Sequence, residues 1–153
     1  MKKENIVVFP HRLDEEKRPD LFQALIEELR THPIFKNWKF LKTKDHCANK
    51  HEYYSLLRRS KIAISFAEQE TWGIAMQEAA FNGCYPIVPD RLSYSEMYPD
   101  CCKYNTWSEL IEIMECFAKD RDNYKKKVNY WTDRLEYKGK NAITNMVDSM
   151  KLM

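Results

Sequence analysis

The segment that most constrains the fold is residues 61–98, which read as a strand, a loop, a helix and a second strand. A run of β-branched and aromatic residues at 62–66 leads into a polar loop and then into an alanine-rich helical stretch. Asn82-Gly83 is a typical helix stop, and an apolar run at 85–88 follows it. Strands that alternate with helices in this way favour a parallel sheet. The segment therefore predicts an α/β domain.

Two glutamates, Glu70 and Glu78, flank the start of this helix with seven residues between them. Glu70 follows the carboxyl end of a strand, where open α/β sheets bind ligands, and the free N–H groups at residues 72–74 favour an anion. Gly73 lets the backbone approach a ligand closely. A carboxylate at Glu78 can accept two hydroxyl hydrogen bonds, as a sugar diol offers. Composition alone favours two solvated glutamates, whereas the flanking strands and the glycine favour a ligand site.

The first loop of the chain carries a second motif. Residues 9–17 read Phe-Pro-His-Arg-Leu-Asp-Glu-Glu-Lys, with an arginine and a lysine five positions apart. Together with the Glu-x7-Glu segment, this loop resembles the C-terminal, donor-binding domain of retaining GT-B-fold glycosyltransferases of family 4 and its relatives. Residues 83–86 (Gly-Cys-Tyr-Pro) and 92–99 resemble the branch of that family that contains the tRNA-queuosine mannosyltransferases. The resemblance covers roughly residues 5–118.

The resemblance implies a nucleoside diphosphate sugar of the UDP or GDP type as donor substrate, with no cofactor and no metal. Arg12 and Lys17 would hold the diphosphate and stabilise its growing charge, Glu78 would hold the ribose, and Glu70 would hold the sugar. The predicted catalytic residues are Glu70, Arg12 and Lys17, and the predicted donor-binding residues are Arg12, Lys17, Glu70, Thr71, Trp72, Gly73, Ile74 and Glu78. The alternative for the first loop is a solvated, salt-bridged turn, because three acidic residues separate its two basic ones.

Three features depart from the family pattern. His11 stands where the family has glycine, and it is more typical of a structural loop histidine than of a catalytic base. Only one strand-like run, at 38–43, lies between the first two helices, where the family usually has two. The chain also begins almost directly at the first strand of the donor domain, so we expect the acceptor-binding half of a GT-B enzyme to be absent.

Apolar periodicity along the whole chain predicts alternating elements. Strands are expected at 6–9, 38–41, 62–66 and 85–88, helices at 20–31, 53–59, 72–81 and 107–118, and a short turn or helix at 95–98. Asp20 is expected to cap the first helix, with Gln23 completing a capping box. This order predicts one Rossmann-like, nucleotide-sugar-binding domain over residues 1–153, with a parallel sheet covered by helices on both faces, as a single GT-B half-domain.

The C-terminus carries an apolar stripe at helical spacing, which predicts an amphipathic helix at 141–151 within a C-terminal element at 139–153. The stripe consists of Ile143, Met146, Val147 and Met150. The helix either packs on its own domain or presents its apolar face to a partner. The partner would be an acceptor-binding domain or chain, or a second copy of this chain.

Composition limits the remaining classes. The net charge of +2 is balanced and does not indicate nucleic acid, so the lysines at 36–50 and 125–127 are either a phosphate-contacting face or a solvated surface. No apolar run approaches the roughly 20 residues of a membrane span, so no span is expected, and the start of the sequence gives no expectation of a secretory signal. Five cysteines favour a reducing, cytoplasmic location. His46-Cys47, His51 and Cys101-Cys102 lack the paired spacing of a zinc site, so no metal is expected.

We therefore expect a glycosyltransferase domain that transfers a sugar from a nucleoside diphosphate sugar to an acceptor. The resemblance suggests a modified nucleobase in nucleic acid as one such acceptor. The alternatives are a nucleotide-sugar-binding module without turnover, and a subunit of a split glycosyltransferase.

Overall fold

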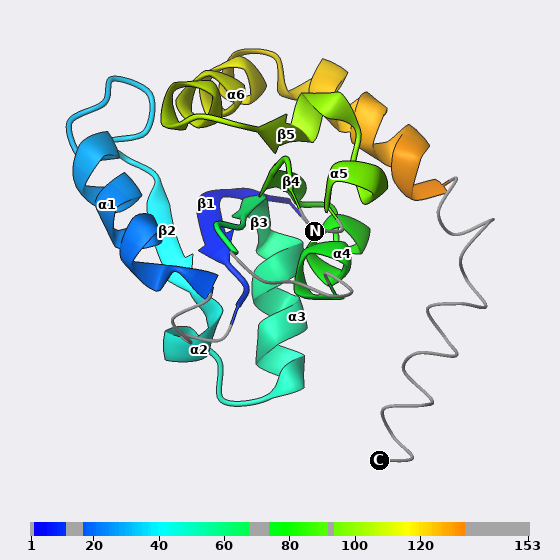
Figure 1. The fold of residues 1–153 in the computed structure, drawn as a ribbon. Helices are drawn as coiled ribbons and strands as arrows, with labels where there is room; N and C mark the ends of the chain where they lie inside the picture. The colour runs from blue at the N-terminus through cyan, green and yellow to red at the C-terminus, as the bar shows by residue number, and fades with distance from the viewer. Residues whose placement is uncertain (1, 12–16, 68–73, 92–93, 134–153) are drawn as a thin grey trace.

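The computed structural model describes residues 2–11, 17–67, 74–91 and 94–133. These residues form a five-stranded, wholly parallel sheet with the strand order β2-β1-β3-β4-β5 (Figure 1). The strands are β1 (Glu4–Phe9), β2 (Lys39–Lys42), β3 (Ser60–Ile64), β4 (Tyr85–Pro89) and β5 (Lys103–Tyr104). The predicted Rossmann-like α/β fold is confirmed.

Helices cover both faces of this sheet. They are α1 (Pro19–Leu29), α2 (Thr43–His46), α3 (Lys50–Arg59), α4 (Ile74–Phe81), α5 (Tyr94–Met97) and α6 (Trp107–Lys119), together with the 3-10 turn η2 (Asp100–Cys102) and a helical stretch at 121–133. On one face α6 contacts α1, because the indole of Trp107 donates a 2.9 Å hydrogen bond to Glu28. On the other face α3 contacts α4 (Figure 1). Right-handed crossovers of opposite direction account for the two layers.

The central strands are apolar at successive positions because both of their faces are covered. Val7, Val8, Ala63, Ile64 and Ile87 are fully buried. A strand that is half-exposed would alternate apolar and polar residues, whereas a strand buried on both sides does not. This burial makes the central strands rigid, and the connections of the candidate site begin at the ends of these strands.

The start of α1 differs from the prediction. Asp20 does not cap this helix, which begins one residue earlier at Pro19 with Arg18 as the N-cap in a left-handed conformation (φ 54°). Proline suits the first helical position because its φ is already helical and its missing N–H has no partner there. The Asp20 carboxylate instead accepts two hydrogen bonds from the Arg18 guanidinium, at 2.9 and 3.0 Å. The predicted capping box with Gln23 is therefore wrong.

Capping boxes do begin the two helices α3 and α6. Asn49 Oδ1 accepts the Glu52 N–H at 2.9 Å, and Thr106 Oγ1 accepts the Glu109 N–H at 3.1 Å. The carboxylate of each glutamate in turn accepts a hydrogen bond from the backbone N–H of the residue just before the cap, at 2.6 and 2.7 Å. The cap at Asn49 places the start of α3 at Lys50 rather than at the predicted residue 53, which brings the first turn of this helix to the carboxyl edge of the sheet.

The predicted helix stop at Asn82-Gly83 is confirmed. Helix α4 ends at Phe81, and Gly83 adopts a positive φ of 89° while its N–H and that of Cys84 bond back to α4 carbonyl groups. A Cβ at position 83 would lie 2.9 Å from the side chain of Lys3. The positive φ favours glycine at this position, and a larger residue would also require the end of the Lys3 side chain to shift.

Four elements were not predicted, namely α2, η2, β5 and the helical stretch at 121–133, and one prediction lies outside the described residues. Strand β5 is only two residues long and pairs with β4 through Val88–Lys103 and Pro89–Tyr104. Two residues are too few to show the apolar pattern that predicts a strand. The helical stretch at 121–133 is mostly polar, and Val128 is its one fully buried residue among those described. The C-terminal helix expected within 139–153 lies outside the described residues.

Candidate functional site

The strand order defines where a ligand would bind. Strands β1 and β3 are neighbours, but the chain leaves β1 toward β2 on one side and leaves β3 toward β4 on the other. Such a reversal is a topological switch point, and open α/β sheets bind ligands just outside the carboxyl ends of the strands there. The candidate site therefore lies beyond Phe9 and Ile64, where these two strands end.

A buried polar network joins the ends of four strands at this edge. His11 Nε2 and Ser65 Oγ, which follow β1 and β3, lie 2.9 Å apart, and Ser65 Oγ is 3.2 Å from the Tyr94 hydroxyl. Tyr104 in β5 donates a 2.6 Å hydrogen bond to the Ser65 carbonyl. At the border of this network Arg91, an exposed residue beyond β4, donates to two carbonyl groups just after β3, at 3.0 and 3.1 Å. Fully paired buried networks are rigid, so this one fixes the points from which the predicted site loops depart.

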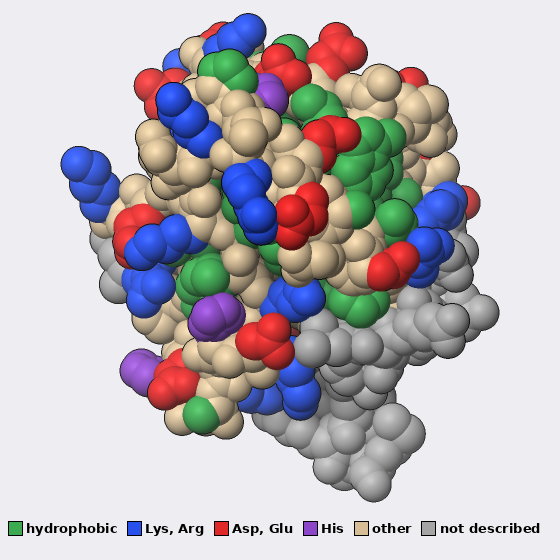
Figure 2. Space-filling model, turned by 90° about the vertical axis from the view of Figure 1, so that its left-hand side faces the viewer, with side chains coloured by type: hydrophobic (Ala, Val, Ile, Leu, Met, Phe, Trp, Pro, Cys, Tyr) green, Lys and Arg blue, Asp and Glu red, His purple; other side chains and the backbone are tan. Residues whose placement is uncertain are grey.

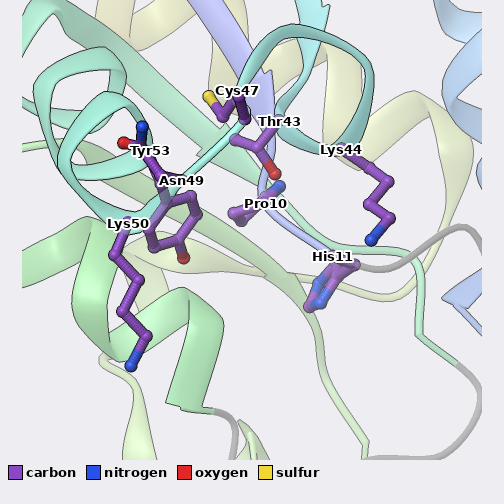
Figure 3. A pocket seen from close by; sticks show the side chains of 9 residues that line it. Pro10, His11, Thr43, Lys44, Cys47, Asn49, Lys50 and Tyr53 are labelled. Carbon is purple, nitrogen blue, oxygen red and sulfur yellow. The ribbon is translucent and has the colours of Figure 1, made fainter.

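A pocket of about 300 Å³ opens beside this network (Figure 3). Its lining comes from the end of β1, from α2 and from the start of α3, and consists of Pro10, His11, Thr43, Lys44, Cys47, Ala48, Asn49, Lys50 and Tyr53. In Figure 3 the side chains of Tyr53 and Lys50 lie on one side of Pro10, and those of His11 and Lys44 lie on the other. The pocket thus combines an aromatic ring, amide and hydroxyl groups and two ammonium groups, which suits a polar, anionic ligand with a planar or apolar part.

Glu78 lies next to this pocket, half-buried between α4 and α3. Burial raises the pKa of the Glu78 carboxyl, while the hydrogen bond from Tyr54 and the charge of Lys50 act in the opposite direction. Burial also raises the pKa of the Tyr53 and Tyr54 hydroxyls, which therefore stay protonated as donors at neutral pH. Glu78 is therefore a partly desolvated acceptor that retains oxygen lone pairs for a hydroxyl-bearing ligand.

The structure describes three of the predicted site residues. Lys17 lies just before α1, which follows β1, whereas Ile74 and Glu78 lie in the first two turns of α4, which follows β3. All three therefore lie at or near the carboxyl edge of the sheet, and their roles stay predictions. The other five predicted site residues, Arg12, Glu70, Thr71, Trp72 and Gly73, lie outside the described residues.

Sequence reasoning missed the half of the pocket that comes from α2 and α3. Thr43 holds this side in place, since its hydroxyl donates to the Phe9 carbonyl at 3.3 Å. The sequence signal that could have indicated this part of the pocket is the Asn-x-x-Glu pair at residues 49–52, which marks the start of a helix. His11, expected to be a structural loop histidine, is buried and is bonded to Ser65, which fits that expectation.

The described residues contain no group of three or more histidine, cysteine, aspartate or glutamate side chains placed to hold a metal ion. Within the same part of the chain, no helix is both long and apolar enough to cross a membrane.

Comparison with solved structures identifies the class of domain. The chain superposes on the crystal structure of the catalytic domain of cholesterol-alpha-glucosyltransferase from Helicobacter pylori, with a TM-score of 0.65. The match covers 86% of this chain and 98% of that one, at 14% sequence identity, and so shows a shared fold. The chain has the Rossmann-like fold of a GT-B glycosyltransferase domain.

Comparison with curated proteins identifies a particular relative, although no family model matches the chain. Over 86 residues the chain is 41% identical to the tRNA-queuosine alpha-mannosyltransferase of Drosophila melanogaster. This match covers 52% of the chain and 23% of the relative, so the chain matches less than a quarter of that protein's length. The predicted resemblance to a glycosyltransferase domain of this branch is thereby confirmed.

Proposed function

We propose that this domain binds a nucleoside diphosphate sugar and provides the donor side of a glycosyl transfer. The observation that carries the proposal is the polar pocket at the switch point, next to the half-buried Glu78. A donor of this kind combines a planar base, a ribose diol and a diphosphate. The pocket offers the aromatic ring of Tyr53 and the ammonium groups of Lys44 and Lys50, and Glu78 offers a diol acceptor beside it.

The proposed roles follow the resemblance to retaining GT-B glycosyltransferases, and the chemistry of each side chain suits its role. Arg12 and Lys17 would hold the diphosphate, whose negative charge grows as the glycosidic bond breaks, and would stabilise it electrostatically. Glu78 would hold the ribose hydroxyls, and Glu70 with the backbone of 71–74 would hold the sugar. The donor would be of the UDP or GDP type, with no further cofactor.

The acceptor is proposed from the relative alone. The printed name of the relative suggests a modified nucleobase in tRNA. Basic and acidic side chains are interspersed over the face that Figure 2 shows, so this face offers no extended surface of one charge for a phosphate backbone. We further propose a cytoplasmic location, because all five cysteines are free.

Binding measurements with UDP, GDP and their sugar conjugates test the proposal. Arg12→Ala should weaken UDP or GDP by about tenfold or more, and the matching nucleoside much less, because the lost hydrogen bonds are to phosphate. Glu78→Gln should weaken nucleotide and nucleotide sugar alike, whereas Glu70→Gln should weaken only the sugar conjugate. Glu112→Gln, an exposed glutamate on α6, is the matched control and should bind like the wild type.

The alternatives make different predictions in the same experiments. If the pocket binds no nucleotide, or if Glu78→Gln binds as the wild type does while folded, the donor site is wrong. A non-catalytic module would bind the donor but would transfer no sugar even with the acceptor-binding half present. A split enzyme would co-purify with a second polypeptide that restores transfer.

A further inference from the structure

Two adjacent cysteines, Cys101 and Cys102, lie on the 3-10 turn η2 that leads into β5. Their sulfur atoms are 4.0 Å apart, within hydrogen-bonding distance. The side chain of Cys101 is partly exposed, whereas Cys102 is fully buried. One turn of the chain thus places the sulfur of a partly exposed cysteine next to that of a buried one.

The surroundings of the pair make the two sulfurs chemically different. The thiol of Cys102 stabilises the thiolate of Cys101 by a hydrogen bond, and this bond, opposed by burial and assisted by Tyr85 and Lys127, lowers the pKa of Cys101 to about 6. Burial raises the pKa of Cys102 well above its ordinary value. The hydrogen bond between the two sulfurs therefore favours the nucleophilic thiolate form at Cys101 and the protonated thiol at Cys102.

We propose that Cys101 and Cys102 form a reversible redox site, in which a hydroperoxide oxidises Cys101 and Cys102 then closes a vicinal disulfide.

The proposed chemistry balances with the hydroperoxide as the oxidant. The Cys101 thiolate attacks one peroxide oxygen, the O–O bond breaks, a sulfenic acid forms and hydroxide or alkoxide leaves. The sulfur of Cys102 then attacks the sulfenic sulfur, the S–S bond forms, and the hydroxyl group leaves with the Cys102 proton as water. The dithiol loses two electrons and the peroxide gains two. A reducing dithiol reverses the disulfide by exchange.

The backbone geometry suits a disulfide that opens easily. The sulfurs must approach by about 2 Å to reach the length of an S–S bond. Adjacent Cα atoms across a trans peptide are about 3.8 Å apart, which is closer than in most disulfides. The backbone of η2 is also held, because the Tyr85 hydroxyl donates a 2.6 Å hydrogen bond to the Cys101 carbonyl. Strained disulfides are more readily reduced, as a reversible site in a reducing compartment requires.

The other cysteines of the chain do not share this arrangement and serve as internal controls. Cys84 is buried, donates to the Leu57 carbonyl at 3.1 Å, and has a pKa that burial raises to about 12. The pKa of Cys47 is raised as well. Cys116 is partly exposed and lies on α6. We therefore expect peroxide to oxidise the two cysteines of η2 before the other three cysteines.

The test treats the reduced 153-residue chain with hydrogen peroxide at neutral pH and follows intact mass and peptide maps. We expect a species lighter by two hydrogens, with the loss confined to the peptide that contains Cys101 and Cys102, and full reversal by dithiothreitol. We also expect iodoacetamide to modify Cys101 at least about tenfold faster than Cys47 or Cys116.

Variants assign the roles of the two sulfurs. Cys101→Ser should abolish the fast reaction, while Cys102→Ser should let the sulfenic acid at Cys101 accumulate, where dimedone traps it. Cys116→Ser is the matched control and should oxidise as the wild type does. Oxidation of Cys101 no faster than that of Cys116 in the folded wild type would overturn the proposal. Oxidation that yields only disulfides between chains would overturn it too, and neither result depends on how variants fold.

Discussion

Lys3 connects β1 to the ends of two helices through a single ammonium group. Its Nζ lies within hydrogen-bonding distance of four backbone carbonyls, those of Leu57 (3.2 Å), Arg58 (2.8 Å), Ser60 (2.8 Å) and Asn82 (3.0 Å). These carbonyls belong to the last turns of α3 and α4 or follow them, where the helix dipole is negative. A cation at this place adds a charged donor to carbonyl oxygens at helix ends, two of which, those of Leu57 and Ser60, also accept from the Cys84 thiol.

Replacing Lys3 by methionine should therefore destabilise the fold. We expect Lys3→Met to lower the free energy of unfolding by about 2 kcal/mol, because hydrogen bonds to a charged group are lost while the apolar stem remains. Urea denaturation measures the change. Lys2→Met is the control, since Lys2 is exposed and should change stability by less than about 0.5 kcal/mol. Equal midpoints for the two variants would contradict this role.

Glu78 should be a residue whose removal does not destabilise the fold. Burial raises its pKa in the folded state above the ordinary value of 4.5, so the folded protein binds this proton more tightly than the unfolded chain. The ionised carboxylate therefore costs stability above its folded-state pKa, and this cost disappears as the pH falls to the ordinary value. Glu78→Gln, whose amide oxygen can still accept the Tyr54 hydrogen bond, removes the cost.

The expected outcome for Glu78→Gln is a melting temperature at pH 7 that is equal to or above that of the wild type. The difference should shrink as the pH is lowered toward 4.5. Thermal unfolding at several pH values measures it. A variant that binds nucleotide poorly while melting no lower would separate a functional role from a structural one, whereas a clearly lower melting temperature at pH 7 would contradict the desolvation argument.

At the scale of helices and strands, elements are predicted correctly from the sequence where one apolar pattern dominates. The prediction is wrong where two local tendencies compete for the same position. The buried strands β1, β3 and β4 and the amphipathic helix α6 have clear apolar patterns and were predicted. The start of α1 was misplaced because Pro19 at the first helical position outweighs the capping tendency of Asp20. Strand β5 was missed since two residues carry no period, and tertiary pairing with β4 alone defines it.

The candidate site shows the same division. The Glu-x7-Glu segment indicated the edge of the sheet after β3, and Glu78 does lie there beside a pocket. The contribution of α2 and α3 could not be predicted from residue spacing. Thr43 in α2 and Tyr53 in α3 are far in sequence from Pro10 and His11, and the order of the strands in the sheet brings them to the same pocket. The hydrogen bond between His11 and Ser65 likewise spans 54 positions, and no local pattern encodes it.

Two helix caps test whether α3 positions the pocket. Asn49→Ala and Thr106→Ala each remove a side-chain cap and should each lower the free energy of unfolding by about 1 kcal/mol. Asn49 lines the pocket and Thr106 does not. We therefore expect only Asn49→Ala to weaken donor binding, as measured by calorimetry on variants of matched stability. Equal effects on binding would show that the α3 terminus has no specific part in the site.

At the scale of the whole molecule, the described residues form one sheet, and the candidate site lies at its carboxyl edge. The resemblance to GT-B enzymes implies an active-site cleft between two such domains, and the chain covers 23% of the mannosyltransferase that it matches. We expect the proposed donor-binding residues to hold the donor by their own contacts. An acceptor, however, must be held in line with the sugar from the opposite side of the cleft.

We therefore expect these 153 residues alone to bind a nucleoside diphosphate sugar but to transfer the sugar slowly. Without a second wall the positioning contribution to the rate is lost, and a rate at least about a hundredfold lower than with an acceptor-binding domain supplied in trans is the expected result. Mass spectrometry of the glycosylated acceptor, together with sedimentation of the same sample, measures both rate and assembly state. Efficient multiple turnover by a monomer of this chain would show that one domain suffices, because a monomer has no partner to supply the opposite wall.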